Sequence, residues 1–331
     1  MILAGDVGGT STRLAWFGGD DGRPDREWIG RSADHESLTA LVRAFLGSGP
    51  PPEVAVFGIA GPVVGNACDA TNLAWQVDGD ALGRALGIPR VVLINDLVAT
   101  AHGLATLPPA DLEVLQAGTA HPGNRALIAA GTGLGQAVLA PDGSGWRPLA
   151  TEGGHTDFSP GDPVEDELLV WLRARLGHVS WERVLSGPGL ADLYRFHAAT
   201  GRGEEPAGFA ARFAAAPDPA ALVSESARGD NPRAALVIER FVSLYGAQAG
   251  NLALQSLALG GVYIGGGIAP RILPFLRAGG FLAAFRAKGR FAPLLATIPV
   301  TVMLDDRAAL WGAAAVARSL AGRTARTART A

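Results

Sequence analysis

Residues 2–10, ILAGDVGGT, carry the pattern from which the fold class follows, because an apolar strand there ends in a glycine-rich turn. Strand character resumes at residues 11–17, STRLAWF, so the turn joins the two arms of a hairpin. The same order recurs later, with a strand at 125–130, a glycine loop at 131–135 and a second strand at 136–140. We interpret the recurrence as a duplicated strand–glycine loop–strand unit.

Helical and strand patterns alternate over much of the chain. Apolar residues spaced three and four apart indicate helices, and short apolar runs bounded by turns indicate buried strands. The alternation predicts an α/β protein. The predicted helices are 36–46, 80–86, one beginning near residue 96, 233–259 and 307–320, with mainly helical structure at 163–228, and the further strands are 27–31, 54–60, 91–94, 262–264 and 300–304.

Length and composition are those of a globular enzyme. The 331 residues are enough for one large domain or two, and 48% of them are apolar. A net charge of −3 argues against a nucleic-acid partner bound through overall electrostatics. Cys68 is the only cysteine, which excludes an internal disulfide framework and a multi-thiolate zinc site.

No targeting or membrane segment is predicted. The first residues lack the basic and apolar regions of a secretory signal, and no uninterrupted run of about 20 apolar residues is present. We therefore expect a cytoplasmic protein with no membrane partner.

A polar pair, Asn95 and Asp96, follows directly on the apolar run VVLI at 91–94. In open α/β sheets, ligands bind at the carboxyl ends of such strands. An acid at this place, with an amide beside it, could hold a polyol and accept a proton from it. The glycine loops indicate that the hydroxyl oxygen, once it has lost this proton, would attack a phosphate.

The first glycine loop has the composition of a phosphate-binding turn. Gly8 and Gly9 let backbone amides approach phosphate oxygens without a Cβ clash, and Thr10 offers a hydroxyl donor. Asp6 could hold Mg²⁺ directly or through water, since Mg²⁺ prefers hard oxygen ligands. A plain hairpin turn is the alternative interpretation.

The second glycine loop contains Gly131, Thr132, Gly133 and Gly135. It is not a dinucleotide-binding fingerprint, because its spacing differs and a strand follows it, and it lacks the Gly-Lys-Ser/Thr of a Walker loop. A simple turn is again the alternative. Two such loops at corresponding points of a repeated unit favour a shared function.

A third cluster, EGGH at 152–155, places paired glycines between Glu152 and His155. A zinc site would need further ligands of suitable spacing, and no serine elbow accompanies the histidine. Hydrogen bonding to sugar hydroxyls fits better, because a carboxylate accepts and an imidazole can donate. A capped surface turn is the alternative.

Two other segments carry weaker signals. Glu182 lies in WERVLSGPG at 181–189, and a glutamate in a helical turn is most often a solvated surface charge. Gly265, Gly266 and Gly267 join a buried strand to a helix, and such a junction could contact an adenosine through its backbone.

Together these segments resemble those of the bacterial glucokinase family, in the actin-like ATPase and sugar-kinase superfamily, from Ile2 to about Leu320. The related repressor and kinase group with a cysteine-rich zinc site matches less well, because Cys68 is the only thiol. The resemblance implies a two-lobed actin-like (ribonuclease H-like) fold with an interlobe cleft, and ATP-dependent phosphorylation of glucose at its 6-hydroxyl. The segments that carry it are 5–10, 94–96, 131–135, 152–155, 182–189 and 265–271.

The resemblance also implies a role for each candidate residue. Asp96 would be the general base, and Asp6 would face Mg²⁺ and the phosphates of ATP. The sugar hydroxyls would be held by Asn95, Glu152, His155 and Glu182. The phosphates would face the turn Gly8, Gly9 and Thr10 and the loop Gly131, Thr132, Gly133 and Gly135, and the adenosine would lie near Gly265, Gly266 and Gly267.

The expected domain organisation follows from the same resemblance. We expect a small α/β lobe at 1–106 plus 305–320, a large α+β lobe at 107–304 and a disordered tail at 321–331. The family also implies a homodimer, for which the apolar helices of the large lobe would be an interface.

Other functions are compatible with parts of the pattern. The substrate could be another hexose or an N-acetylhexosamine, because the stereochemistry of one hydroxyl is read by only a few hydrogen bonds. A sugar-binding regulator without catalysis would usually carry a helix-turn-helix segment, for which the strand at 2–4 starts too early. An actin-like filament or chaperone ATPase would lack the polar residues assigned to the sugar.

Overall fold

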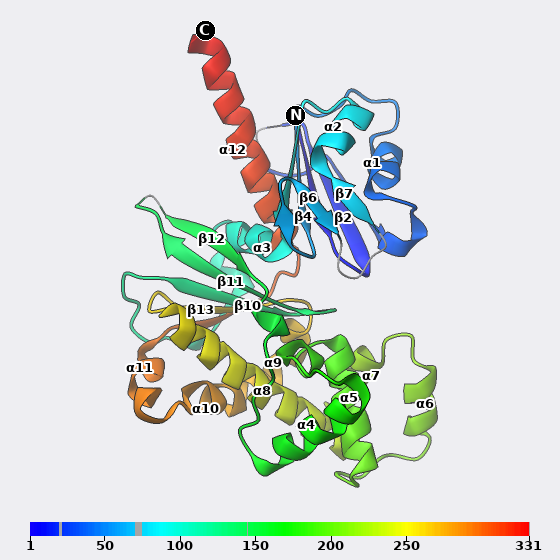
Figure 1. Cartoon of the computed structure of the whole chain (residues 1–331), viewed down its shortest axis with the longest axis vertical. Coiled ribbons are helices and arrows are strands. Elements are labelled where there is room, and N and C mark those ends of the chain that lie inside the picture. Colours follow the sequence, from blue (N-terminus) through cyan, green and yellow to red (C-terminus); the bar gives the residue numbers. More distant parts are fainter. Residues whose placement is uncertain (20–21, 70–74, 144, 331) are drawn as a thin grey trace. The chain divides into compact units, whose positions relative to one another are not determined.

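The chain folds into two compact units, each built around a large sheet of its own (Figure 1). The computed structural model describes residues 1–19, 22–69, 75–143 and 145–330. Unit 1 comprises Met1–Pro109, Pro148–Ala150 and Asp305–Ala331, and unit 2 comprises Ala110–Arg147 and Thr151–Leu304. No helix in the described ranges is long and apolar enough to cross a membrane.

Unit 1 is built on a five-stranded sheet. In sheet order its strands are β3 (Arg26–Arg31), β2 (Ser11–Phe17), β1 (Ile2–Val7), β4 (Val54–Ile59) and β8 (Arg90–Asn95). A smaller sheet contains β5 (Val63–Val64), β6 (Ala67–Asp69) and β7 (Gln76–Asp78). β1 pairs antiparallel with β2, whereas β1, β4 and β8 run parallel. The carboxyl ends of these three strands therefore lie side by side along one edge of the sheet, the one at the strand ends, and both Asp6 and Asn95 lie there.

Helices cover both faces of this sheet, namely α1 (Leu38–Leu46), α2 (Gly79–Leu86), α3 (Asp96–Leu104) and α12 (Ala308–Thr330). Because side chains alternate between faces along a strand, Leu3 packs with residues of α1 and α2, whereas Ile2 and Ala4 pack with residues of α12. By the same alternation, Asp6 lies on the face that α12 covers.

Helices α3 and α12 approach each other closely through two glycines. A Cβ added at Gly103 would lie 1.9 Å from the carbonyl oxygen of Ala308, and one added at Gly312 would lie 1.7 Å from that of Ala99. Only glycine permits such an approach of two backbones. The start of α12 is therefore packed directly against α3, the helix that Asp96 begins.

The last helix extends beyond the predicted end at Leu320. α12 continues to Thr330, so the segment 321–330, for which the sequence analysis predicts disorder, is helical in the structure. Alanine and arginine make up much of that segment and are among the better helix formers, which accounts for the difference. Ala331 lies outside the described residues.

Unit 2 combines a set of helices with a six-stranded sheet, all of which belongs to this unit except Pro148–Ala150 of β12. In sheet order the strands are β12 (Trp146–Thr151), β11 (Leu134–Pro141), β10 (Arg125–Ala130), β13 (Val262–Gly265), β14 (Val300–Met303) and β9 (Leu112–Gln116). The helices are α4 (Pro163–Leu176), α5 (Gly187–Ala199), α6 (Phe209–Ala215), α7 (Pro219–Ser226), α8 (Pro232–Ser256), α9 (Leu273–Arg277), α10 (Gly280–Arg286) and α11 (Ala292–Thr297). The long helix α8 carries much of the core of this unit, including Phe241 and Tyr245.

The two large sheets repeat one topology. Unit 1 has the order β3-β2-β1-β4-β8, and five consecutive strands of the unit 2 sheet have the order β12-β11-β10-β13-β14. In each sheet one strand pairs antiparallel with the next strand along the chain, across a glycine turn, and parallel with its other neighbour. This repeat confirms the duplicated strand–glycine loop–strand unit and the α/β class. The interlobe cleft stays a prediction.

Candidate functional site

Asn95 lies where strand β8 passes directly into helix α3, and it caps that helix. Its Oδ1 accepts hydrogen bonds from the backbone N–H groups of Leu97 (3.0 Å) and Val98 (3.3 Å). Its Nδ2 donates to the carbonyl oxygen of Gly61 at 3.2 Å. This buried side chain therefore has a capping function that the sequence analysis did not predict. Its contact with a sugar stays a prediction.

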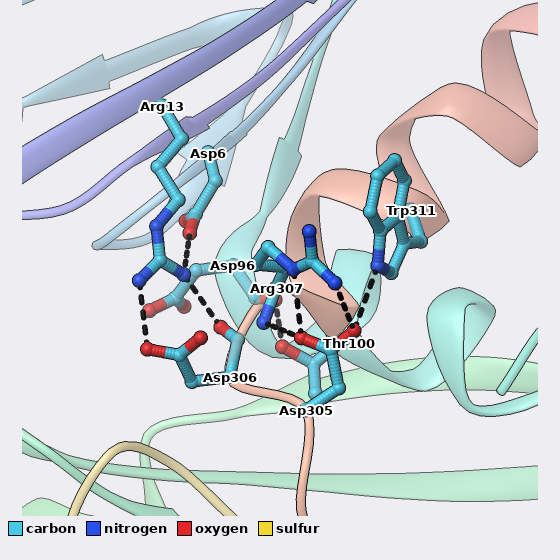
Figure 2. A network of polar contacts seen from close by, with 8 residues as sticks. All are labelled: Asp6, Arg13, Asp96, Thr100, Asp305, Asp306, Arg307 and Trp311. Atoms are coloured by element: carbon cyan, nitrogen blue, oxygen red, sulfur yellow. Dashed lines mark hydrogen bonds and ion pairs between the residues drawn. The ribbon is translucent and has the colours of Figure 1, made fainter. Parts of the chain in front are cut away.

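Asp96 is the first residue of α3 and is half-buried. Its Oδ1 accepts a hydrogen bond from the N–H of Leu97 at 2.9 Å, and its carbonyl oxygen accepts one from Oγ1 of Thr100 at 2.9 Å. A carboxylate at a helix N-terminus is stabilised by the free N–H groups and the helix dipole there. Asp96 is thus held at the start of α3, within the network of polar contacts shown in Figure 2.

Asp6 is a second acid at this edge of the unit 1 sheet. It lies opposite Arg13 in the register of β1 and β2, and Nη1 of Arg13 is 4.0 Å from Oδ2 of Asp6. Arg13 also donates hydrogen bonds to Asp306, to its carbonyl oxygen at 2.8 Å and to its Oδ2 at 2.7 Å (Figure 2). Burial raises the pKa of Asp6 to about 6, while Arg13 lowers that pKa and Asp306 raises it further.

The first glycine turn is held by buried hydroxyl groups. Oγ of Ser32 donates to the carbonyl oxygen of Gly8 at 2.8 Å. The N–H of Ser32 donates to the carbonyl oxygen of Thr10 at 3.2 Å. The hydroxyl oxygens of Ser32 and Thr12 are 2.9 Å apart, and both side chains are buried. Ser32 fixes the shape of the turn, but no motif around it would have identified it from the sequence.

The second glycine loop is anchored to helix α5. The N–H of Gly131 donates to the carbonyl oxygen of Gly133 at 2.8 Å, which closes a tight turn. The N–H of Gly187, the first residue of α5, donates to the carbonyl oxygen of Gly131 at 2.8 Å. Gly135 already belongs to β11, where it pairs with Ala129. The turn itself is therefore shorter than the five-residue loop of the prediction.

The glycine junction after β13 lies beside the second loop. The N–H of Ile268 donates to the carbonyl oxygen of Ala130 at 3.3 Å, and a Cβ added at Gly266, where φ is +84°, would lie 2.3 Å from that oxygen. The hydroxyl of Tyr245 accepts from the N–H of Ala130 at 3.1 Å and lies 3.1 Å from the carbonyl oxygen of Gly265. Burial raises the pKa of Tyr245, so its hydroxyl stays protonated and can donate to that carbonyl. Tyr245 thus joins the loop and the junction, although the sequence indicates only that it lies on an apolar helix face.

Glu152, His155 and Glu182 are brought together in unit 2. Nε2 of His155 is 3.9 Å from Oε2 of Glu152, and its Nδ1 is 3.9 Å from Oε1 of Glu182. Oε2 of Glu182 accepts a hydrogen bond from the N–H of Leu134 at 2.9 Å, so this carboxylate also contacts the end of the second glycine loop. Glu152 and His155 are about half exposed, whereas Glu182 is 24% exposed. Residues predicted from separate segments thus form one polar cluster, and their contact with a sugar stays a prediction.

The paired glycines of this cluster allow a close approach to β11. A Cβ added at Gly154 would lie 1.9 Å from the carbonyl oxygen of Leu134, and one added at Gly153 would lie 2.4 Å from Oε1 of Gln136. Because glycine has no Cβ, the 3₁₀ turn Gly153–His155 can lie against the strand. The turn thereby holds the polar side chains at its two ends near each other.

Protein ligands for a metal ion are few. Within the ranges that the structure describes, no group of three or more His, Cys, Asp or Glu side chains is arranged to hold a metal. Mg²⁺ bound to a nucleotide needs only one or two carboxylates, because water and phosphate oxygens complete its octahedron. Asp6, near the turn at Gly8, is a carboxylate of that kind. The residues present therefore fit a nucleotide-bound Mg²⁺ and do not fit an all-protein cage.

Comparison with known proteins identifies related enzymes over nearly the whole chain. A family model described as Glucokinase matches residues 3–320. The glucokinase of Synechocystis sp. is 41% identical, over 96% of this chain and 97% of its own length.

Solved structures agree with the sequence comparison. A glucokinase from an Antarctic psychrotroph has a TM-score of 0.75 and 31% identity, and the match covers 96% of this chain and 98% of that one. A ROK family glucokinase from Streptomyces griseus, solved in complex with glucose and AMPPNP, has a TM-score of 0.67 and 22% identity, over 96% of this chain and 99% of that one. These likenesses confirm the predicted actin-like fold class.

Proposed function

The chain belongs to the glucokinase family, and on this basis we propose that it transfers the γ-phosphoryl group of ATP to the 6-hydroxyl of D-glucose. The observation that best supports the proposal is the position of the Glu182 carboxylate. It accepts a hydrogen bond from Leu134 of the second glycine loop and lies 3.9 Å from His155. One side chain thus joins a cluster suited to sugar hydroxyls with a loop suited to phosphate.

Asp96 is the proposed general base of this reaction. As the 6-oxygen of glucose forms its bond to the γ-phosphorus, the bond from that phosphorus to the leaving oxygen of ADP breaks, and the carboxylate accepts the hydroxyl proton. Phosphoryl transfer depends mainly on positioning and charge stabilisation. The cap that Asn95 forms on α3 supports this role, because it holds the helix start, and with it Asp96, in one place.

The phosphates of ATP are proposed to bind to the two glycine turns through backbone N–H groups. Ser32 supports the turn at Gly8, and the anchor on α5 supports the turn at Gly131. Asp6 would hold Mg²⁺ directly or through water. When bound, the ion would neutralise charge on the phosphates of the nucleotide.

Sugar and adenosine are assigned to the remaining candidate residues. Carboxylates accept hydrogen bonds from sugar hydroxyls, an imidazole can donate them and an amide can do both, which supports sugar binding by Asn95, Glu152, His155 and Glu182. Gly265, Gly266 and Gly267 are proposed to lie near the adenosine, because backbone without side chains can approach a flat ring system closely. The choice of ATP as donor is supported by the family and by the AMPPNP complex of the Streptomyces griseus enzyme.

Steady-state kinetics with a panel of sugars test the proposed substrate. We expect kcat/KM, measured with ATP and Mg²⁺, to be higher for glucose than for mannose, fructose or N-acetylglucosamine. A poor value for glucose beside a high value for another sugar would make that sugar the substrate. Binding of glucose without turnover of any sugar would instead indicate a sugar-responsive regulator.

Gly133→Ala is expected to weaken the binding of both substrates while the protein stays folded. The added Cβ would lie 2.5 Å from Oε2 of Glu182, so that flexible side chain must move and lose its hydrogen bond to Leu134. Loss of a hydrogen bond to a charged group corresponds to about a 10-fold rise in KM. Steady-state kinetics should show that rise for glucose and for ATP. Gly145→Ala is the matched control, because an added Cβ there meets no atom within 4 Å. A rise for glucose alone would contradict the link between the cluster and the loop.

Four further expectations stay predictions, namely the lobe boundaries, the interlobe cleft, the homodimer and the cytoplasmic location. The family resemblance supports a homodimer, and exposed apolar side chains on helices of unit 2, such as Val170 and Leu236, are compatible with one.

A further inference from the structure

Arg13 has no part in the roles assigned so far, yet it stands beside the proposed magnesium carboxylate. The register of β1 and β2 places it directly opposite Asp6. Both residues lie on the α12 face, because Ala4 and Ala15, two positions away from each in the same strands, pack in the cluster with α12. Its side chain is only 19% exposed, so its position is restricted by the surrounding protein.

Asp306, two residues before the first residue of α12, holds the guanidinium of Arg13 from the other side. Nη1 and Nη2 of Arg13 donate to the carbonyl oxygen and to Oδ2 of Asp306 at 2.8 and 2.7 Å, whereas the distance from Nη1 to Asp6 is 4.0 Å (Figure 2). Two short hydrogen bonds from a planar group define its orientation. Asp306 therefore fixes the guanidinium of Arg13, whose Nη1 lies at ion-pair distance from the Asp6 carboxylate.

We propose that Arg13 and Asp306 are positioning residues that orient the Asp6 carboxylate toward the Mg²⁺ of the bound nucleotide. The inference rests on the proposed role of Asp6. Arg13 and Asp306 carry opposite charges and together contribute little net charge near Asp6. Their contribution is therefore to geometry, as for groups that orient metal ligands from outside the coordination shell.

The test compares the binding of AMPPNP with and without Mg²⁺ by isothermal titration calorimetry. The quantity of interest is the factor by which Mg²⁺ tightens binding of the nucleotide. We expect this factor to fall about 10-fold in Arg13→Gln, in Asp306→Asn and in the double variant, as is usual when groups that orient a metal ligand are lost. The double variant distinguishes an effect on the orientation of Asp6 from an effect of net charge, because it removes both charges and leaves the net charge unchanged. If Asp306 acts through Arg13, the double variant should be no worse than Arg13→Gln alone.

Arg307→Gln is the matched control. Arg307 makes its ion pair with Asp305, two residues before it, and has no hydrogen bond to Asp6 or Asp306 among the described contacts. The Arg307→Gln variant should therefore keep the wild-type factor by which Mg²⁺ tightens nucleotide binding, although it also removes an Arg–Asp pair at the start of α12. Asp306→Asn leaves the carbonyl bond to Arg13 intact, so this variant should fold even if Arg13→Gln does not.

A wild-type factor in the double variant would overturn the proposal. So would an equal loss in Arg307→Gln, because any loosening of the α12 start would then explain the result. Asp6→Asn separates this inference from the proposed function on which it rests. If that variant loses the Mg²⁺ effect and the double variant does not, only the positioning role fails. If Asp6→Asn keeps the Mg²⁺ effect on nucleotide binding, the proposed metal role of Asp6 fails together with the positioning role of Arg13 and Asp306.

Discussion

Asp96→Asn is expected to lower kcat for glucose phosphorylation by about 10²- to 10⁴-fold, the usual contribution of a general base. Asparagine has nearly the same shape, and its Oδ1 can still accept the hydrogen bond from the N–H of Leu97, so the start of α3 should be preserved. It cannot accept the proton of the sugar hydroxyl. Steady-state kinetics should therefore show a large loss of kcat with little change in glucose binding.

Glu152→Gln is the matched control, because it makes the same carboxylate-to-amide change in the polar cluster of unit 2. We expect it mainly to raise the KM for glucose, since a sugar contact would be weakened while the proposed base is retained. Near-normal turnover by Asp96→Asn would remove Asp96 from the base role. An unchanged KM in Glu152→Gln would count against a sugar contact at that position.

Asp6→Asn is expected to lower kcat/KM for ATP in the presence of Mg²⁺ by at least about 10²-fold, as for other losses of a charge-stabilising group. The amide has no negative charge with which to hold the cation. In the wild-type protein the same loss should develop as the pH falls below about 6, because Asp6 then takes up a proton. The pH profile of kcat/KM for ATP, with far-UV circular dichroism to verify folding, measures both effects. An acidic limb that persists unchanged in Asp6→Asn would belong to another group.

The same substitution should make the protein more stable at neutral pH. Burial raises the pKa of Asp6 from 3.8 to about 6 in the folded protein, so between these values the folded chain binds a proton that the unfolded chain has lost. The free energy of unfolding therefore falls as the pH rises through this window, and ionised Asp6 destabilises the fold above it. Asparagine removes that cost, which corresponds to about 1–3 kcal/mol at pH 7.

Urea unfolding in the absence of Mg²⁺ measures this gain. The gain should disappear near pH 4, where folded wild-type Asp6 is already neutral. A stabilisation of the same size at pH 4 and pH 7 would show that charge burial is not its cause. The opposite signs of the two effects, lost activity and gained stability, are those expected of a functional charge held in a buried place.

Elements that are buried and regular could be predicted closely from the sequence. β10 occupies Arg125–Ala130, the predicted range, and α8 runs over Pro232–Ser256 where the pattern predicts 233–259. Their signals are local, a continuous apolar run for one and a three-four spacing for the other.

Short strands at exposed edges were missed. β12, WRPLAT, contains a proline and is largely exposed, and β9 is partly exposed along most of its length, so neither has a continuous apolar run. The small strands β5, β6 and β7 are two or three residues long, too short for any periodic pattern. Such strands form because a neighbouring strand offers hydrogen bonds, which a single segment of sequence does not reveal.

The chemical groups of the candidate site, and the turns that present them, were accessible from the sequence because both are local properties. Glycines mark the bends, and an acid at the end of an apolar run marks a strand terminus. The pairing of Asp6 with Arg13 is almost local as well, since a hairpin brings them opposite each other.

Packing over long distances in the chain decides the partners of these groups. Asp306 lies 293 positions from Arg13, Glu182 lies 48 from Leu134, and Tyr245 lies 115 from Ala130. No periodicity or motif links such pairs, because they meet only when helices pack on sheets. The hydrophobic effect that drives this packing is non-directional, so it leaves no local signal in the sequence. The residues proposed to bind and transfer a phosphate can be identified from the sequence, whereas the contacts that orient them form only in the folded protein.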